Sequence, residues 1–393
     1  MKLSYKNIII LILTFFIILF LSNCNSIIEN NQVKKIIKKQ LKSPFKIITK
    51  NRLLDIKKIS FANLKLNKIP KIISEMKNLE KINLNNNNLE NVPDFLLNLK
   101  NLREIDLSYN NLNIIPETIF KLNTLQIINL NHNKIEIIPD RIKELFILKE
   151  LYISNNALTA ISPEINKLSS LRYLDISKNN ISNLDDIHLP NLSYLNIDNN
   201  QIQFLPDSIF TNQLVILKAG KNKITSLPDN IAICTSLNTL RLEDNNIRIF
   251  PENIKDISSL KNLNLSRNNI TYIPKEIIAI ESLENLWLNG NNISNIPLSI
   301  SELINLRKLY LDDNSFYEFP GALFNLRNNL YELSMKNNHI QSLPDEVNKM
   351  NLKFFYLKNN PIVNLNDKLL NWKKKEISEK MNNRLSGRNI IIL

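Results

Sequence analysis

The sequence predicts an α/β solenoid of about 14 stacked repeats, a horseshoe with parallel strands on its concave face. Prolines recur at a step of 23 residues, first from Pro70 to Pro139 and again from Pro228 to Pro320. Each belongs to one pattern, LxxLxLxxNxLxxLPxxIxxLxx, of which residues 102–124 are the clearest copy. Asparagine occurs 67 times although it forms helices and strands poorly, so the fold must use it repeatedly. A fixed period of this length indicates units that bury their apolar edges against each other.

Each template position, numbered from the first leucine of the pattern, has a physical task. The LxxLxL segment predicts a short parallel strand whose alternate residues are buried. Asparagine at position 9 offers two donors and an acceptor to inward-pointing backbone groups where the chain leaves the strand. Proline then fixes φ for the descending turn, and the IxxL segment predicts a short helical or extended stretch. The asparagines expected to form a ladder between repeats are Asn87, Asn110, Asn133, Asn156, Asn179, Asn200, Asn222, Asn245, Asn268, Asn291, Asn314, Asn338 and Asn360.

This pattern resembles the leucine-rich repeat proteins, in the 23-residue LPxxI variety found in bacterial, leptospiral and plant Ras-group proteins. The resemblance covers residues 56–370 and departs in the first repeat, where Leu64 stands at the asparagine position. A departure there suits a terminal, capping copy. The resemblance implies a solenoid that binds proteins and carries no catalytic site and no cofactor.

The N-terminus is expected to be a signal peptide over residues 1–23. Lys2 and Lys6 precede the apolar run 8–21, which is too short for a typical membrane span. Residues 21–24 then resemble a bacterial lipobox, which implies that Cys24 is lipidated, although Asn23 departs from the usual small residue. A secreted protein cut nearby and an uncleaved anchor are the alternatives. Each of the three places the protein outside the cytoplasm, in or beyond the bacterial envelope at the outer membrane or cell surface.

Both ends of the solenoid need covers, and these define the remaining domains. Residues 24–55 would hold the lipid-attachment site and an N-terminal cap or linker, because Val33, Ile37 and Leu41 recur at helical spacing together with Ile36. The lysines between them leave open a second interpretation, a basic helix lying on anionic lipid. Residues 371–393 would form a C-terminal cap and tail, including Trp372, Ile377 and Met381.

The net charge of +13 is concentrated at the two ends, with +8 in residues 1–55 and +4 in residues 371–393. The repeat body is therefore almost neutral and offers no basic stripe for nucleic acid. Three histidines and two cysteines leave little for a metal site, so we expect neither metal nor cofactor. Cys234 stands at an apolar template position and is expected to be a buried, inert thiol.

The concave face is the expected binding surface. Template positions 3, 5, 7 and 8 should point into the concavity, where stability does not dictate the side chain. Aromatic residues beside arginine are enriched at protein interfaces, although aromatic residues are also common in strands for structural reasons. Asp312 and Asp313 are interpreted as a solvated acidic pair in preference to a calcium site. The residues expected to contact a protein partner are Tyr152, Tyr173, Tyr194, Arg241, Arg267, Trp287, Tyr310 and Tyr356.

Together these features predict a monomeric, non-catalytic protein-interaction module, held on the bacterial envelope by an N-terminal lipid. Family analogy extends the partners to host proteins. The alternative is a periplasmic scaffold of the envelope with a largely idle concave face. Catalysis is disfavoured because His132, His188 and His339 fall at scattered surface positions and none can pair with Cys234.

Overall fold

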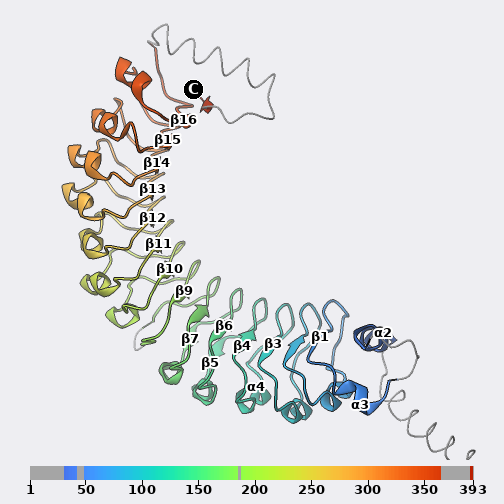
Figure 1. Ribbon diagram of the computed structural model, residues 1–393. Coiled ribbons are helices and arrows are strands. Elements are labelled where there is room, and N and C mark those ends of the chain that lie inside the picture. The colour runs from blue at the N-terminus through green and yellow to red at the C-terminus, as the bar shows by residue number, and fades with distance from the viewer. Residues whose placement is uncertain (1–30, 42–47, 185–186, 364–389, 393) are drawn as a thin grey trace, which may run out of the picture. The chain divides into compact units, whose positions relative to one another are not determined.

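The computed structural model describes residues 31–41, 48–184, 187–363 and 390–392. The chain divides into two compact units, Met1–Asn179 (unit 1) and Asn180–Leu393 (unit 2). Both units repeat the same coil, in which a short strand lies on one side and a helical turn on the other (Figure 1). The strand of every predicted repeat falls on template positions 3 to 5, so the predicted α/β solenoid is confirmed in each unit.

The main strands of unit 1 pair in chain order and are all parallel. They are β1 (Lys58–Ser60), β2 (Lys81–Asn83), β3 (Glu104–Asp106), β4 (Ile127–Asn129), β6 (Glu150–Tyr152) and β8 (Tyr173–Asp175). A second, two-stranded parallel sheet joins β5 (Ile137–Ile138) to β7 (Ala160–Ile161). The helices and helical turns are α2 (Asn31–Gln40), α3 (Lys50–Leu53), η1 (Lys71–Glu75), η2 (Asp94–Asn98), α4 (Glu117–Lys121), η3 (Asp140–Glu144) and η4 (Pro163–Lys167).

Unit 2 continues the same parallel arrangement. Its strands are β9 (Tyr194–Asn196), β10 (Ile216–Lys218), β11 (Thr239–Arg241), β12 (Asn262–Asn264), β13 (Asn285–Trp287), β14 (Lys308–Tyr310), β15 (Glu332–Ser334), β16 (Phe354–Tyr356) and β17 (Ile390–Ile392). Its helical turns are η5 (Asp207–Ile209), η6 (Asp229–Ile233), η7 (Glu252–Asp256), η8 (Lys275–Ala279), η9 (Leu298–Glu302), η10 (Gly321–Leu326) and η11 (Asp345–Lys349). The pairing of β17 with β16 adds a strand that no repeat predicts.

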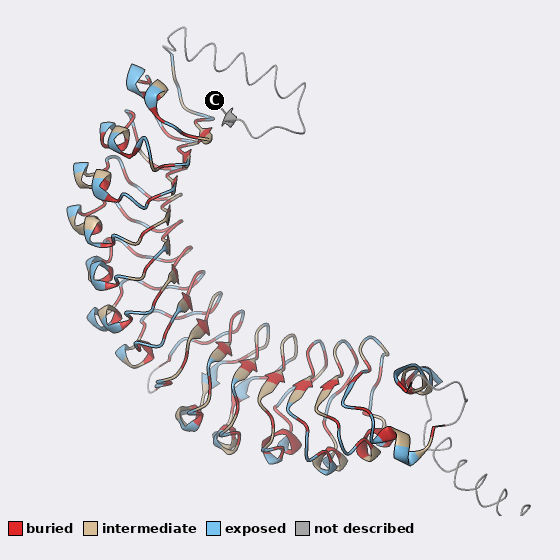
Figure 2. Ribbon diagram, viewed as in Figure 1, coloured by how far each residue is buried: buried red, intermediate tan, exposed pale blue. Residues whose placement is uncertain are grey.

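The core of each coil lies between its strand and its helical turn, and Figure 2 shows buried residues on both. In β11, for example, Leu240 is buried while Thr239 and Arg241 stay half-exposed on the opposite side of the strand. The helical turns are mostly 3-10, and a proline usually precedes each of them, as Pro228 precedes η6. Unit 2 bends toward its strands (Figure 1), because strands about 4.8 Å apart pack more closely than helical turns can.

The position-9 asparagines are buried or nearly so, and each bonds the coil before it. Asn245 is typical: its Oδ1 accepts from the backbone N–H of Ile224 at 2.9 Å. Its Nδ2 donates to the carbonyl oxygens of Ala219 at 2.9 Å and of Leu242 at 3.0 Å. Asn110 and Asn338 make the same set of bonds in their own coils. The amide of Asn245 therefore supplies the partner of the Ile224 N–H, and it shares the carbonyl oxygens of two coils with Asn222 and Asn268.

The residue before each ladder asparagine has a left-handed backbone, which the sequence did not predict. Tyr109, His132 and Arg267, for example, have φ between 51° and 56°. Gly290 takes the same conformation at φ 64°. Side chains at template position 8 are thus held by the turn itself, at a conformational cost that glycine escapes and that asparagine and aspartate tolerate best among the other residues.

The N-terminal helix α2 lies beside β1 (Figure 1). It buries Val33, Ile37 and Leu41, which is the placement expected of a cap, while Ile36 stays half-exposed. The guanidinium of Arg52 donates to the carbonyl oxygen of Leu41 at 2.8 Å and ties α2 to α3.

The expected signal peptide, Cys24 and the C-terminal cap residues Trp372, Ile377 and Met381 lie outside the described residues. Within the described ranges, no helix has both the length and the apolar character needed to span a membrane.

Candidate protein-binding face

The strand face of unit 1 carries a pair of tyrosines. Tyr152 on β6 and Tyr173 on β8 have ring centroids 4.7 Å apart, with their planes tilted by 36°. The hydroxyl of Tyr152 donates to Glu150 Oε2 at 2.7 Å. Burial, helped by that carboxylate, raises the pKa of Tyr152, so its hydroxyl stays protonated and remains a donor. The two rings form a half-buried aromatic surface in a fixed position.

A larger aromatic group lies on the strand face of unit 2, and we call Trp287, Tyr310, Phe354 and Tyr356 the aromatic cluster. Trp287 and Tyr310 are register partners whose planes are almost parallel, at 3°, with centroids 5.8 Å apart. Tyr356 falls on the same template position two coils further, and its ring stacks with that of Phe354 at 6.5 Å. Repetition of one template position thus aligns Trp287, Tyr310 and Tyr356, with Ser334 between the last two.

Cations flank this cluster. The ammonium of Lys336 lies 5.4 Å from the ring centroid of Tyr356, and that of Lys353 lies 5.6 Å from the ring of Phe354. Glu332 accepts a hydrogen bond from the hydroxyl of Tyr310, and the pKa of that hydroxyl is raised, first by burial and then by this carboxylate. Cation–π and ring contacts hold the aromatic planes, so a partner would meet an ordered surface.

The remaining predicted contact residues also have partners within unit 2. Tyr194 on β9 lies under the ammonium of Lys218, 5.2 Å from the ring centroid. The Nε of Arg241 donates to Glu243 Oε1 at 3.0 Å. In the same way, the Nη2 of Arg267 donates to Asp244 Oδ2 at 2.6 Å. Ion pairs inside the chain therefore already fix the two arginines that were expected to meet a partner.

Template position 7 was expected to point into the concavity, but several of its side chains are buried. Glu243 and Asp312 are buried, at 5% and 8% exposure, and so is Ser108 at 2%. Lys336 stands at the same position and stays half-exposed beside the ring of Tyr356. Ser108 donates its backbone N–H to Asp106 Oδ1 at 2.9 Å. Gly220 leaves room for Glu243, because a Cβ there would lie 2.9 Å from Cδ and 3.1 Å from the backbone oxygen of that residue.

The expected solvated pair Asp312 and Asp313 is engaged by the protein itself. Asp312 accepts from the hydroxyl of Ser334 and from the backbone N–H of Lys336 at 2.7 Å. Asp313 Oδ1 accepts from the amide of Asn337 at 2.6 Å. The description of Asp312 as solvated was therefore wrong, because its carboxylate joins two neighbouring coils.

The histidines and the thiol occupy separate environments. His132 stacks on Tyr109 at 3.9 Å, and burial together with the charge of Lys178 lowers its pKa. His339 lies beside Tyr317, with ring centroids 5.1 Å apart. Cys234 is fully buried, and burial raises its pKa to about 11. Across the residues that the structure describes, no group of three His, Cys, Asp or Glu side chains could hold a metal ion.

Comparison with solved structures supports the architecture. A leucine-rich repeat protein of Leptospira interrogans is 26% identical, with a TM-score of 0.58 over 86% of this chain and 96% of its own. The internalin InlF of Listeria monocytogenes is 23% identical, with a TM-score of 0.75 over 87% and 98%. The ectodomain of the receptor kinase GASSHO1/SCHENGEN3 of Arabidopsis thaliana, in complex with CASPARIAN STRIP INTEGRITY FACTOR 2, is 24% identical. Its TM-score is 0.55 over 75% of this chain and 43% of its own.

Comparison with protein families agrees with the repeat pattern. No curated protein sequence matches the chain. One family model, described as leucine-rich repeat, matches residues 77–135, 190–247 and 235–293. A second, described as two copies of the leucine-rich repeat, matches residues 148–187 and 169–209. The two models together match more than half of the sequence, and the chain belongs to the leucine-rich repeat proteins.

Proposed function

We propose that this protein is a non-catalytic interaction module that binds a protein partner on its strand face, with the aromatic cluster of unit 2 as the principal contact. Leucine-rich repeat domains are commonly protein-interaction scaffolds and are generally not enzymes. The observation that carries the proposal is the presence of two stacks of half-buried rings on one face, Trp287–Tyr310 and Phe354–Tyr356. Large, rigid aromatic side chains bury much area at little cost in conformational entropy and dominate protein interfaces.

The strand face of unit 2 also has charged residues beside its apolar centre, as the rim of a protein interface does. Lys336, Lys353 and the Arg267–Asp244 pair place charge beside the rings. Such charges contribute orientation and association rate more than affinity. The tyrosine pair of unit 1 offers a second, smaller contact area.

Capture of partners with the purified protein tests this face directly. Removal of both rings in Trp287→Ala plus Tyr310→Ala should weaken capture at least about a hundredfold, because central aromatic contacts are worth about 2 kcal/mol or more each. The matched control is Tyr317→Ala, which removes an exposed ring at template position 12, away from the strand face. Equal capture by the double variant and the control would refute the proposed face.

We further propose that Cys24 carries a lipid that holds the monomeric protein on the outside of the bacterial envelope, where host proteins are accessible as partners. The support is the basic and apolar N-terminal sequence that ends at Cys24. Cys24→Ala should abolish metabolic labelling by fatty acid and release the protein from the membrane fraction. If the wild-type protein lies on the outside of the cell, protease added to intact cells should digest it. A protected protein would instead favour the alternative, a periplasmic scaffold.

A further inference from the structure

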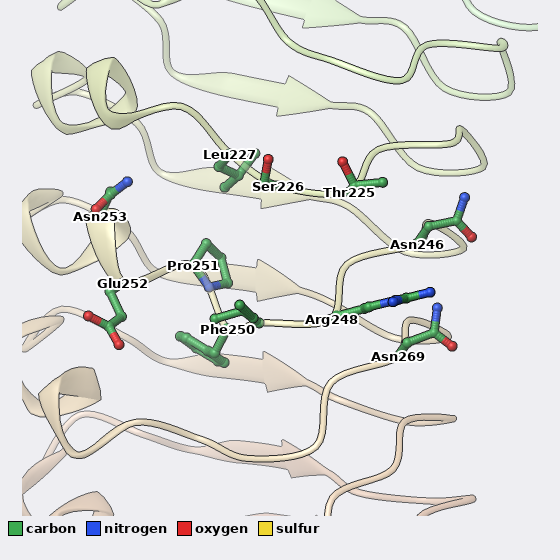
Figure 3. Close-up of a pocket in the computed structure, with 11 residues that line it drawn as sticks. Thr225, Ser226, Leu227, Asn246, Arg248, Phe250, Pro251, Glu252, Asn253 and Asn269 are labelled. Carbon is green, nitrogen blue, oxygen red and sulfur yellow. The ribbon is translucent and has the colours of Figure 1, made fainter.

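Unit 2 has a hollow on the flank of its coils, between strand and helical turn, that the strand face does not include. It has a volume of about 690 Å³, within the usual range for ligand sites. Figure 3 shows Arg248, Asn246 and Asn269 at one end of the hollow and Glu252 at the other, with Phe250 and Pro251 between them. Its lining residues are Thr225, Ser226, Leu227, Asn246, Arg248, Ile249, Phe250, Pro251, Glu252, Asn253 and Asn269.

The hollow exists because two neighbouring coils differ in side-chain size at the same template positions. The coil of η6 has Thr225 and Ser226 at positions 12 and 13, whereas the next coil has Arg248 and Ile249 there. The short hydroxyl side chains leave space against the wall formed by the long ones. Phe250 is buried at 1% exposure and closes the hollow from below, where most coils have leucine or isoleucine.

One end of this hollow consists of unused hydrogen-bond donors. The guanidinium of Arg248 has no ion pair and no hydrogen bond with any described residue. The side chains of Asn246, Asn269, Thr225 and Ser226 are likewise without hydrogen bonds to the described part of the chain. A guanidinium between two amides matches a carboxylate, which can accept two parallel N–H bonds from the arginine.

The other groups at the hollow make its edge apolar and give its two ends opposite charge. Ile249 is 64% exposed at the edge of the hollow, and Phe204 and Tyr272 stand exposed at the same template position of coils on either side. Glu252 lies at the end opposite to Arg248 (Figure 3) and repels an anion there. A ligand therefore meets a cation at one end and apolar surface along the flank.

We infer that this flank hollow is a second binding site, for an extended peptide of a partner protein in which a carboxylate side chain is followed by apolar residues. The carboxylate binds Arg248 with Asn246 and Asn269, and the apolar residues cover Ile249 and the exposed rings beside it. Charge complementarity selects this occupant, because the unpaired cation is the only charge at the donor end of the hollow. The site is independent of the aromatic cluster and of any lipid anchor.

The probe is a capped, fluorescein-labelled peptide of alternating glutamate and leucine, with matched peptides that carry glutamine or lysine in place of glutamate. Fluorescence anisotropy with the full chain should show glutamate bound about tenfold or more tightly than glutamine, and lysine most weakly. A tenfold preference corresponds to about 1.4 kcal/mol, within the range for a hydrogen bond to a charged group.

Three variants locate the site. Arg248→Gln should remove the preference for glutamate over glutamine, whereas Arg327→Gln, an exposed arginine elsewhere in unit 2, changes the net charge equally and should keep it. Ser226→Trp fills the hollow and should weaken all three peptides while Arg248 remains. Because these side chains are exposed, circular dichroism should show each variant folded as the wild type.

Equal binding of the glutamate and glutamine peptides by the wild type overturns the inference, as does a preference that survives Arg248→Gln. Self-association of the chain that Ser226→Trp abolishes would overturn it as well, since a second copy would then be the occupant. None of these results depends on Trp287 or Tyr310, so failure here is distinguishable from failure of the proposed strand-face function.

Discussion

Replacement of Asn245 by alanine should cost this protein about 3–5 kcal/mol of unfolding free energy. The amide is buried at 6% exposure and makes three bonds of 3.0 Å or shorter, one from Ile224 and two to Ala219 and Leu242. Alanine would leave the N–H of Ile224 without a partner, at about 1–3 kcal/mol, and would remove one of two amide donors from each carbonyl, at about 1 kcal/mol per bond. Asn222 and Asn268 would still donate to the oxygens of Ala219 and Leu242.

The adjacent asparagine provides the control. Asn246 is exposed, its side chain bonds no described residue, and Asn246→Ala should change the unfolding free energy by less than about 0.5 kcal/mol. Urea unfolding followed by far-ultraviolet circular dichroism would compare both variants with the wild type. The ladder argument fails if Asn245→Ala destabilises the protein no more than Asn246→Ala does.

Three further changes test local features of the coils. Gly220→Ala should lower the unfolding free energy by about 1–3 kcal/mol in the same assay, since its methyl group would press on Glu243, and an unchanged midpoint would contradict that packing. Gly290→Ala should cost about 1 kcal/mol because φ is 64° there, and thermal unfolding that matches the wild type would show that the turn tolerates a side chain. The thiol of Cys234, with its pKa raised to about 11, should resist iodoacetamide at pH 8 in the folded protein and react in urea; rapid labelling without urea would show that it is accessible.

Much of the fold was predictable because its determinants repeat. Leu240 and the leucines equivalent to it are buried where the template places them, and the strands follow from that spacing. The hydrogen bonds of Asn245 were likewise predictable from chemistry, because an amide beside a departing strand has few other uses. Such inferences are reliable here because the residue at a given template position has the same role in every coil.

The details of the strand face were less predictable, because they depend on contacts between neighbouring coils. Burial of Glu243 requires the absence of a side chain at Gly220, and burial of Asp312 requires donors from the following coil. The recurrence of serine, asparagine and aspartate at template position 7, as at Ser108, was the signal that could have shown this position to be structural.

The left-handed turn and the flank hollow escaped prediction for different reasons. Template position 8 carries asparagine in six coils and aspartate in two, the residue types that most readily adopt a positive φ, and this signal was missed. The hollow arises from a size difference between Ser226 and Ile249 at one template position of adjacent coils. A comparison along each template position, coil by coil, is the observation that would have located it.

The central claim is that a protein partner binds the strand face of unit 2, and site-specific photo-crosslinking on cells tests it most directly. A benzoylphenylalanine replaces Asn285, which is half-exposed on β13 two residues before Trp287, or Glu302, which is exposed on the helical turn η9. We expect crosslinks to a discrete partner from position 285 and none from position 302. Crosslinks from position 302 with none from position 285 would contradict the account.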